Sequence, residues 1–510
     1  MNVIGLDLGT SRVKAVRFDE TWKAVATADE VTAVTRPHSG WSEQDMDEVW
    51  AAAVRVVARV AGENGPMSAG DGMSGAAGGD AVGLIAVTGQ GDGCWLVDAA
   101  GRPVRPAMLW NDARSTPMVD AWERDGTLAA TSATTGCYGS PGIANAELRW
   151  LADHEPDVLA RAETLLSCGS WVFQQLTGRR VLDVSEAVNP FLDARTAAYD
   201  DTLLDGYGLR AQQRLLPPVV AAGERAGALT GAAADMIGLP AGTPVVLAPY
   251  DLLTTATGSG VARPGQAFAV LGTTLCVGVL TTDPALNRIP NGLTLPTGHP
   301  GSWLLAYPTM CGTEVLDWTA KLLGLDGPRA LIDLAAQAPQ HPGVHSRATG
   351  VGSGGSGGAP LVVPYFSPAG ERTPFRDSGA RGAVLNLTTE STRADVARAT
   401  VDGLTLAVLD CFLACGGADV LSVSGGGARS ELWCQAISDA VGVPVHRTDG
   451  PEAGALGAAL TGAAETGLVP NLAAAVEQAV GVERRYEPDP RRRDSYRDRL
   501  TELVRVRSLV

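Results

Sequence analysis

The sequence predicts an α/β protein of two domains that arose by duplication, with a cleft between them. Its 510 residues are enough for two large domains or about three of average size. A strand, a Gly-Thr turn and a second strand open the chain, and the same pattern returns about 260 residues later, roughly half the chain. Apolar strands and helical patterns follow in both halves. We place the domains at residues 1–246 and 247–510.

The composition excludes several classes of protein. With 45% hydrophobic and 19% charged residues, the chain is an ordinary soluble globular one. Forty basic against fifty-six acidic residues give a net charge of −16, which disfavours nucleic acid and anionic membranes as partners. The start, MNVIGLDLGT, lacks the basic region of a secretory signal. The eight cysteines form no Cys-x-x-Cys pair, so we expect reduced, buried thiols in a cytoplasmic protein.

The first half reads as strands, one long amphipathic helix and a helical region. VIGLDLG is an apolar strand that contains Asp7, and VKAVRFD is its return strand. EQDMDEVWAAAVRVVARVA predicts a helix with Val49, Val56 and Val60 on one face. AVGLIAVTGQ is the next strand, followed by the loop GQGDG and a hairpin, CWLVDAAGRPVRPAMLW. Helices are expected over residues 114–215.

The second half repeats the opening pattern. PVVLAPYD is an apolar strand that ends in an acid, and QAFAVLGTTLCVGVLTT again gives strand, Gly-Thr turn and strand. VLSVSGGGARS predicts a strand, a triple-glycine turn and the start of a helix, and EAGALGAALTGAAETG a helix of small residues. The charged segment 484–507 predicts a solvated terminal helix.

Three glycine turns that follow strands point to phosphate binding. They are Gly9-Thr10-Ser11, Gly272-Thr273-Thr274 and Gly425-Gly426-Gly427. Glycine lets backbone N–H groups approach a phosphate, and neighbouring hydroxyls add donors. One such turn alone is usually a plain hairpin, but three at matching places favour a nucleotide site. No lysine follows a glycine, which excludes a Walker A loop, and the G-x-G-x-x-G string at 350–355 lies in a Gly/Ser linker.

Three acids, one before the first of these turns, one in the loop GQGDG and one at the end of PVVLAPY, each have a structural and a functional interpretation. Asp7 is either a hydrogen-bonded core aspartate or a carboxylate that faces a phosphate-bound Mg²⁺ through water. Asp251 is either the N-cap of a helix or a general base that takes a proton from a hydroxyl. Asp92, between Gly91 and Gly93, is either a turn residue or a carboxylate that fixes substrate hydroxyls.

Other residues carry weaker signals. Cys411 and Cys415 share a helix face and are expected in the core. His341 and His345 have the spacing of metal ligands, but Pro342 and Gly343 lie between them and no thiolate or carboxylate pair flanks them. Core positions are also the default for the tryptophans of the first half, Trp41, Trp95 and Trp110.

Taken jointly, the motifs resemble those of the FGGY carbohydrate kinases, a family of the actin-like (ribonuclease H-like) superfamily. The resemblance runs essentially end to end and includes LDLGTSRVKAV, GWSEQD, VTGQGDGCWLVDAAGRPVRPAMLWNDAR, APYDLLTTATGSGVARPG, VLGTT, GERTPFRDSGARGAVLNLT and GGGARSELWCQAISDAVGVPV. It implies two actin-like domains that close around ATP and a small sugar or polyol, and transfer of the ATP γ-phosphate to a primary hydroxyl.

The resemblance also implies roles for individual residues. Asp7 would face Mg²⁺ and phosphate, and Asp251 would be the catalytic base in contact with the substrate. The substrate loop would supply Gln90, Gly91 and Asp92. Phosphate and nucleotide contacts would come from a further set, Thr10, Ser11, Lys14, Gly272, Thr273, Gly312, Gly426 and Gly427.

Two departures from the family pattern concern the substrate. Typical xylulokinases read Gly-Gln-Met-His-Gly where this chain has Gly89-Gln90-Gly91-Asp92-Gly93. A carboxylate there is similar to glycerol kinases and, within TGQGDG, to erythritol-type kinases. Gly142 stands where glycerol kinases carry a sugar-contacting tyrosine. The resemblance therefore implies a xylulose-, erythritol- or pentitol-like substrate, and it allows a homodimer.

Two other functions compete with the kinase. A superfamily ATPase without a small substrate would hydrolyse ATP regardless of sugars and would not need Asp251. A catalytically silent sugar sensor would have lost catalysis, but the chain retains Asp7, Asp251 and all three turns.

Overall fold

A computed structural model describes residues 1–62, 81–284, 286, 292–338, 359–368, 370–448, 450, 452–507 and 509. These residues form two compact units, each made of three stretches of chain. The first unit comprises Met1–Ala262, Thr282–Leu304 and Glu452–Val480, and the second comprises Arg263–Thr281, Leu305–Pro451 and Gly481–Val510. The boundary after residue 246 stays a prediction. The glycine string at 350–355 and the pair His341 and His345 lie outside the described residues.

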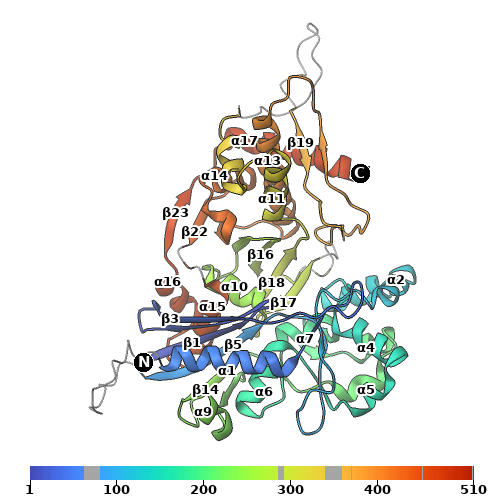
Figure 1. The fold of residues 1–510 in the computed structure, drawn as a ribbon, viewed down its shortest axis with the longest axis vertical. Coiled ribbons are helices and arrows are strands. Elements are labelled where there is room, and N and C mark those ends of the chain that lie inside the picture. Colours follow the sequence, from blue (N-terminus) through green and yellow to red (C-terminus); the bar gives the residue numbers. More distant parts are fainter. Residues whose placement is uncertain are drawn as a thin grey trace. The chain divides into compact units, whose positions relative to one another are not determined.

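The first unit is built on a six-stranded mixed sheet with the order β13-β14-β5-β1-β2-β3 (Figure 1). Its strands are β1 (Asn2–Leu8), β2 (Arg12–Phe18), β3 (Ala24–Val31), β5 (Val82–Gly89), β13 (Ala226–Ala228) and β14 (Pro244–Leu247). Strands β1, β5 and β14 run parallel to one another, whereas β2, β3 and β13 are antiparallel to their neighbours. The three parallel strands therefore end at the same edge of the sheet.

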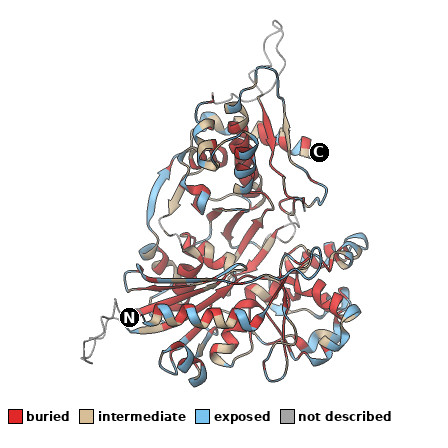
Figure 2. Cartoon of the chain, in the orientation of Figure 1, coloured by how far each residue is buried: buried red, intermediate tan, exposed pale blue. Residues whose placement is uncertain are grey.

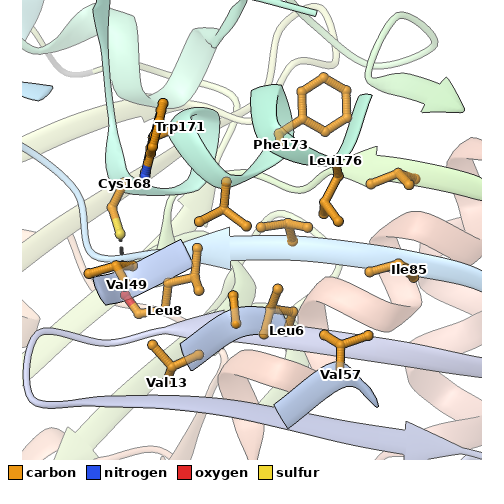
Figure 3. Packing of buried hydrophobic residues seen from close by; sticks show 14 of the residues in the cluster. Leu6, Leu8, Val13, Val49, Val57, Ile85, Cys168, Trp171, Phe173 and Leu176 are labelled. Carbon is orange, nitrogen blue, oxygen red and sulfur yellow. Dashed lines mark hydrogen bonds between the residues drawn. The ribbon is translucent and has the colours of Figure 1, made fainter. Parts of the chain in front are cut away.

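Helices α1 (Met46–Gly62), α6 (Cys168–Thr177) and α9 (Gly231–Ile237) cover one face of this sheet. Leu6, Leu8 and Ile85 point into this core, where Val49 and Val57 of α1 meet them (Figure 3). The predicted apolar face of α1 is confirmed, and Figure 2 shows buried and exposed residues alternating along the helix. The helix begins at Met46 rather than in the predicted EQD segment. Its start is set by the Asp45 carboxylate, which accepts hydrogen bonds from the backbone N–H groups of Asp47 and Glu48.

The other face of the sheet is covered by α15 (Ala453–Glu465) and α16 (Leu472–Ala479). Side chains alternate between the faces of a strand, so Val3, Leu84 and Val246 pack on this side. The predicted helix of small residues is confirmed as α15. Its glycines allow unusually close packing: a Cβ at Gly457 would collide with the Thr254 carbonyl.

The helical region predicted over 114–215 is confirmed and has a hydrophobic core of its own. Its elements are α2 (Thr116–Arg124), α3 (Thr127–Thr135), α4 (Ala144–His154), α5 (Pro156–Arg161), α6, α7 (Val184–Phe191), α8 (Asp201–Gly206) and the 3₁₀ helix η1 (Arg210–Leu215). Short strands of the first unit form two-stranded pairs: β4 (Glu43–Gln44) with β7 (Ala107–Met108), β6 (Trp95–Val97) with β8 (Thr164–Leu166), β9 (Leu182–Asp183) with β12 (Val219–Val220), and β10 (Leu192–Asp193) with β11 (Ala198–Tyr199). Strand β17 (Leu293–Pro296) lies in the later stretch Thr282–Leu304 of this unit.

The second unit repeats this architecture with strands in the order β18-β16-β15-β21-β22-β23. They are β15 (Gln266–Leu271), β16 (Leu275–Thr281), β18 (Trp303–Pro308), β21 (Val420–Ser424), β22 (Val445–Thr448) and β23 (Val482–Tyr486). The other elements are α11 (Thr313–Leu322), α12 (Pro328–Ala335), β19 (Leu361–Val363), β20 (Ala383–Leu385), α13 (Arg393–Ala414), η3 (Gly426–Arg429), α14 (Glu431–Val441) and α17 (Pro490–Arg507). As in the first unit, an antiparallel hairpin, β15–β16, is followed by two parallel strands, β21 and β22. The predicted duplicated α/β fold is thus confirmed.

The charged C-terminal segment differs from the prediction of a solvated helix. Residues 482–486 add the strand β23 to the sheet, and one side of α17 is buried through Tyr496, Leu500 and Leu503. Arg499 Nη1 forms a buried ion pair with Asp402 Oδ2 at 2.7 Å. A mixed acidic and basic segment favours a solvated helix, but the charge of Arg499 is paired inside the second unit. No helix in the described part of the chain is long and apolar enough to cross a membrane.

Candidate active site

The parallel strands of the first unit bring three predicted site residues to one sheet edge. Asp7 of β1 lies opposite Thr88 of β5, and Leu247 of β14 lies opposite Val87. Asp92 lies in the loop that follows β5, and Asp251 is the first residue of α10 (Asp251–Gly258), the helix that follows β14. Burial raises the pKa of Asp251 most, and the charges of Asp7 and Asp92 raise it further, so the three carboxylates influence one another electrostatically.

Asp7 is half-buried and lies against the first turn of α15. A Cβ at Gly454 would collide with the Asp7 carboxylate, so only glycine leaves room for this acid. Lys14 Nζ forms an ion pair with Glu452 Oε2 at 2.5 Å, and both charges act on Asp7. Desolvation raises the pKa of Asp7 to about 6; Lys14 lowers it and Glu452 raises it further. The predicted basic residue, Lys14, is thus paired with Glu452.

Asp251 is the first residue of α10 (Asp251–Gly258), and Tyr250 occupies the N-cap position. The N-cap interpretation of Asp251 is therefore wrong. Burial, and then the charges of Asp7 and Asp92, raise its pKa well above the ordinary value for an aspartate. A carboxylate in these surroundings is a stronger proton acceptor than an exposed one.

Asp92 is held in a strained, well-defined turn. Its backbone has a positive φ of 57°, which residues other than glycine rarely adopt. The preceding Gly91 packs so tightly on the Tyr250 ring that a Cβ would collide with it. Asn189 Nδ2 donates a hydrogen bond of 2.8 Å to Asp92 Oδ1. These contacts fix the direction of the carboxylate, as expected for a group that recognises a ligand.

Thr10 and Gln90 belong to one hydrogen-bond network. Trp110 Nε1 donates to Thr10 Oγ1 at 2.9 Å, and Thr10 Oγ1 donates to Gln90 Oε1 at 2.8 Å. Gln90 Nε2 donates in turn to Gln44 Oε1 at 2.9 Å, and Gln44 Nε2 returns to the Thr10 carbonyl at 3.0 Å. The Thr10 hydroxyl hydrogen is therefore in use, whereas Ser11 is exposed. Trp110 is half-exposed and polar in its contacts, so its assignment to the core is wrong; Trp95 is in the core as predicted.

Sequence reasoning missed several residues of this region. Glu186 lies on α7, and burial and the charges of Asp92, Asp251 and Asp183 raise its pKa well above the ordinary value. Asn189 holds Asp92, and Glu452 holds Lys14. An acid within the apolar stretch LDVSEAVNPF was the available signal for Glu186. Glu452 had none, because it is 438 residues from its partner.

The second unit brings together the other predicted glycines. Val270 of β15 lies opposite Ser424 of the parallel strand β21, so the turns that follow the two strands share one edge. Gly272, Thr273 and Gly426 are partly or fully exposed there. A Cβ at Gly312 would collide with the Thr273 carbonyl, and one at Gly427 with the Trp433 ring. Thr313, which begins α11, donates its N–H to the Gly272 carbonyl at 2.8 Å. Exposed glycine turns beside a helix N-terminus suit an anion.

Removing the Asp7 charge is expected to stabilise the unliganded protein. The pKa of about 6 in the folded protein lies above the ordinary aspartate value of 3.8, so the charged carboxylate destabilises the fold fully at pH values above 6. Asp7→Asn should raise the thermal midpoint by about 1–3 °C near pH 8. The gain should shrink as the pH falls below 6 and vanish below 3.8, where the carboxyl is protonated in both states. Thermal unfolding across that pH range, without added Mg²⁺, measures it.

Asp19 offers a control of the opposite sign. Its small burial cost is outweighed by hydrogen bonds from Thr21 and Lys23, and its pKa is lowered. Asp19→Asn should lower the midpoint or leave it unchanged. A midpoint for Asp7→Asn that does not rise at pH 8 would mean that the Asp7 charge is already compensated.

Comparison with known proteins identifies the family. Residues 2–258 match the N-terminal domain and residues 267–466 the C-terminal domain of the FGGY family of carbohydrate kinases. The chain belongs to the FGGY carbohydrate kinases. The resemblance inferred from the motifs is thereby confirmed.

Relatives of this FGGY kinase have different named substrates. It is 33% identical to the erythritol kinase of Brucella abortus over 477 residues, which cover 92% of this chain and 88% of that protein. It is 31% identical to the xylulose kinase of Escherichia coli over 464 residues, 89% of this chain and 88% of that one. The crystal structure of the Rhodospirillum rubrum xylulose kinase matches 100% of this chain and 99% of its own with a TM-score of 0.85 at 26% identity.

The two departures of this FGGY kinase from the family pattern have structural reasons. Any side chain at Gly91 would collide with Tyr250, so a methionine could not occupy this turn as it stands. Gly142 has a φ of 81°, and a Cβ there would collide with the Trp110 carbonyl. Its own carbonyl accepts the Gly93 N–H at 2.9 Å and so supports the Asp92 turn.

Proposed function

We propose that this FGGY kinase transfers the γ-phosphate of ATP to a primary hydroxyl of a small polyol, such as erythritol or a pentitol. The observation that carries the proposal is the rigidly held Asp92 carboxylate at the sheet edge that also presents Asp251. Support also comes from the 33% identity to an erythritol kinase.

The reaction needs one proton acceptor and a means of neutralising charge. Asp251 accepts the proton of the acceptor hydroxyl while that oxygen forms a bond to the γ-phosphorus and the bond to the β-phosphate oxygen breaks. ADP and the phosphorylated polyol leave, and the proton returns from Asp251 to water. The raised pKa of Asp251 suits this role, because a base works best when its pKa is near the working pH.

The glycine turns are assigned to the phosphates. In the first unit the exposed Ser11 offers its hydroxyl and Lys14 a positive charge, with Thr10 as a backbone support. In the second unit the turns at Gly272, Thr273 and Gly426 would present backbone N–H groups to a nucleotide. The buried Gly312 and Gly427 would let the backbone pack closely behind them.

The residues around Asp7 fit a hydrated Mg²⁺. The donor is a half-buried carboxylate with a pKa raised to about 6, and a cation would relieve the repulsion that it shares with Glu452 and Asp251. When bound, Mg²⁺ neutralises phosphate charge during the transfer. Asp7 would orient its water shell.

A panel of polyols and ketoses, assayed for acceptor-dependent ADP formation, tests the proposal. We expect erythritol or a pentitol to be used at least as well as xylulose. ADP formation that is independent of any acceptor would favour an ATPase, and none at all a sugar sensor.

Asp92→Asn is expected to shift preference towards the ketose. A carboxylate can only accept hydrogen bonds, so it pairs with the hydroxyls of a polyol but not with the carbonyl of a ketose. Asparagine keeps an Oδ1 acceptor for Asn189 and adds a donor. The ratio of kcat/KM for xylulose to that for erythritol should rise by about 5- to 150-fold.

The matched control is Asp98→Asn, an exchange in the next turn of the same region whose carboxylate binds Arg102 at the surface. It should leave the ratio unchanged. A parent enzyme that strongly prefers xylulose, with the same ratio in Asp92→Asn, would contradict the polyol assignment.

A further inference from the structure

Arg225 and Asp183 form a buried ion pair within the first unit. Arg225 Nε is 2.6 Å from Asp183 Oδ2, and both side chains are only 1% exposed. Arg225 also binds Glu465 Oε1 at 3.1 Å and the Thr297 carbonyl at 2.9 Å. Removing two charges from water is costly, so such a pair is maintained where its geometry matters more than the stability it adds.

The second oxygen of Asp183 orients Ser185. Asp183 Oδ1 accepts the Ser185 N–H at 3.0 Å and the Ser185 hydroxyl at 2.5 Å. Because the hydroxyl hydrogen points to Asp183, the lone pairs of Ser185 Oγ face the other way. One of them accepts the backbone N–H of Tyr250 at 3.0 Å. Ser185 is fully buried.

Besides Ser185 of helix α7, strand β5 also holds the backbone before Asp251. Thr88 Oγ1 donates to the Pro249 carbonyl at 2.7 Å and lies 3.1 Å from Thr254 Oγ1 of α10. The segment 249–251 is thus fixed by one hydroxyl at Pro249 and by another at Tyr250, the N-cap of α10.

We propose that Arg225, Asp183 and Ser185 are positioning residues that hold the Tyr250–Asp251 backbone, and with it the Asp251 carboxylate, in line with the acceptor hydroxyl. This inference rests on the proposed role of Asp251. Arg225 fixes Asp183, Asp183 orients the Ser185 hydroxyl, and Ser185 anchors Tyr250. None of the three needs to touch a substrate. A displacement of about 1 Å in a reacting group can cost about 10²-fold in rate.

Ser185→Ala tests the proposal. The exchange leaves the Tyr250 N–H without this acceptor. We expect kcat to fall about 10- to 100-fold with erythritol or xylulose, whichever the parent uses better, while KM for ATP changes less than threefold. Ser438→Ala is the matched control: its buried hydroxyl in the second unit also binds backbone, at 2.8 Å from the Tyr486 carbonyl. It should lose comparable thermal stability and retain kcat.

A double variant shows whether Ser185 acts through Asp251. If it does, adding Ser185→Ala to Asp251→Asn should lower kcat by less than threefold further, because a base that is absent cannot be misplaced. Independent losses that multiply would overturn the proposal, as would a normal kcat in Ser185→Ala beside a collapsed Asp251→Asn. A near-normal kcat in Asp251→Asn would overturn the proposed function itself.

If Ser185→Ala fails to fold, two other variants are compared. Ser185→Thr keeps the hydroxyl, whereas Asp183→Asn weakens the orientation of that hydroxyl. We expect a higher kcat in Ser185→Thr than in Asp183→Asn, and the reverse order would overturn the proposal.

Discussion

Asp251→Asn is expected to lower kcat by at least about 10²-fold while ATP and the acceptor still bind. The exchange keeps the shape of the side chain and removes the proton acceptor at the start of α10. The pKa of Asp251 is raised by burial and by the charges of Asp7 and Asp92, so the parent should lose activity on the acid side as this carboxylate becomes protonated. That acidic limb should be absent from the residual activity of the variant.

Steady-state kinetics across pH, together with calorimetric titration of ATP and polyol, measure these effects. The control is Asp235→Asn, an exposed acid on α9 of the same unit, which should leave kcat unchanged. A purified Asp251→Asn that turns over at nearly the parent rate would remove Asp251 from the proposed mechanism.

Asp7→Ala should chiefly damage the use of Mg·ATP. It deletes the half-buried carboxylate assigned to the metal's water shell, and kcat/KM for ATP should fall by about 10²-fold, with more Mg²⁺ needed for half-maximal rate. The loss should be much smaller for acceptor binding measured without nucleotide. Alanine also leaves space beside Gly454, so Asp7→Asn, which fills it, separates loss of charge from loss of packing.

Titration of the rate with Mg²⁺ at fixed ATP gives the result, with Asp47→Ala on the exposed side of α1 as the control. If both Asp7 variants reproduce the Mg²⁺ and ATP dependence of the parent, Asp7 serves only the structure.

The main elements of the fold could be predicted because their patterns are local. The strands β1, β5, β15 and β21 are short apolar runs closed by glycine turns, and α1 shows a regular apolar face. The repeat of strand, turn and strand was enough to predict two related units. The start of α1 was misplaced by a few residues, because Glu43 and Gln44 pair with β7 and that contact is not visible in the local pattern.

The candidate site was predicted only where the residue types themselves carry the signal. Acids within apolar strands and glycines after strands stand out in a sequence, so Asp7, Asp92 and Asp251 could be selected. Their partners could not, because Asn189, Glu452 and Arg225 look like ordinary helix or loop residues until tertiary contacts are known. The same limit explains Trp110, whose indole N–H contacts a residue 100 positions away.

Strand β1 (Asn2–Leu8) is made long before its covering helix α15 (Ala453–Glu465). Gly5 of β1 is so close to the Ala455 carbonyl that no side chain fits between them, and Val3, Leu84 and Val246 are buried under residues 455–476. During synthesis, then, one face of the first unit's sheet stays uncovered until about 450 residues of the chain have been made. A chain that stops between β22 and α15 would leave this apolar face of the first unit's sheet open to aggregation. We therefore expect the need for chaperones during synthesis to end only when α15 has covered this face.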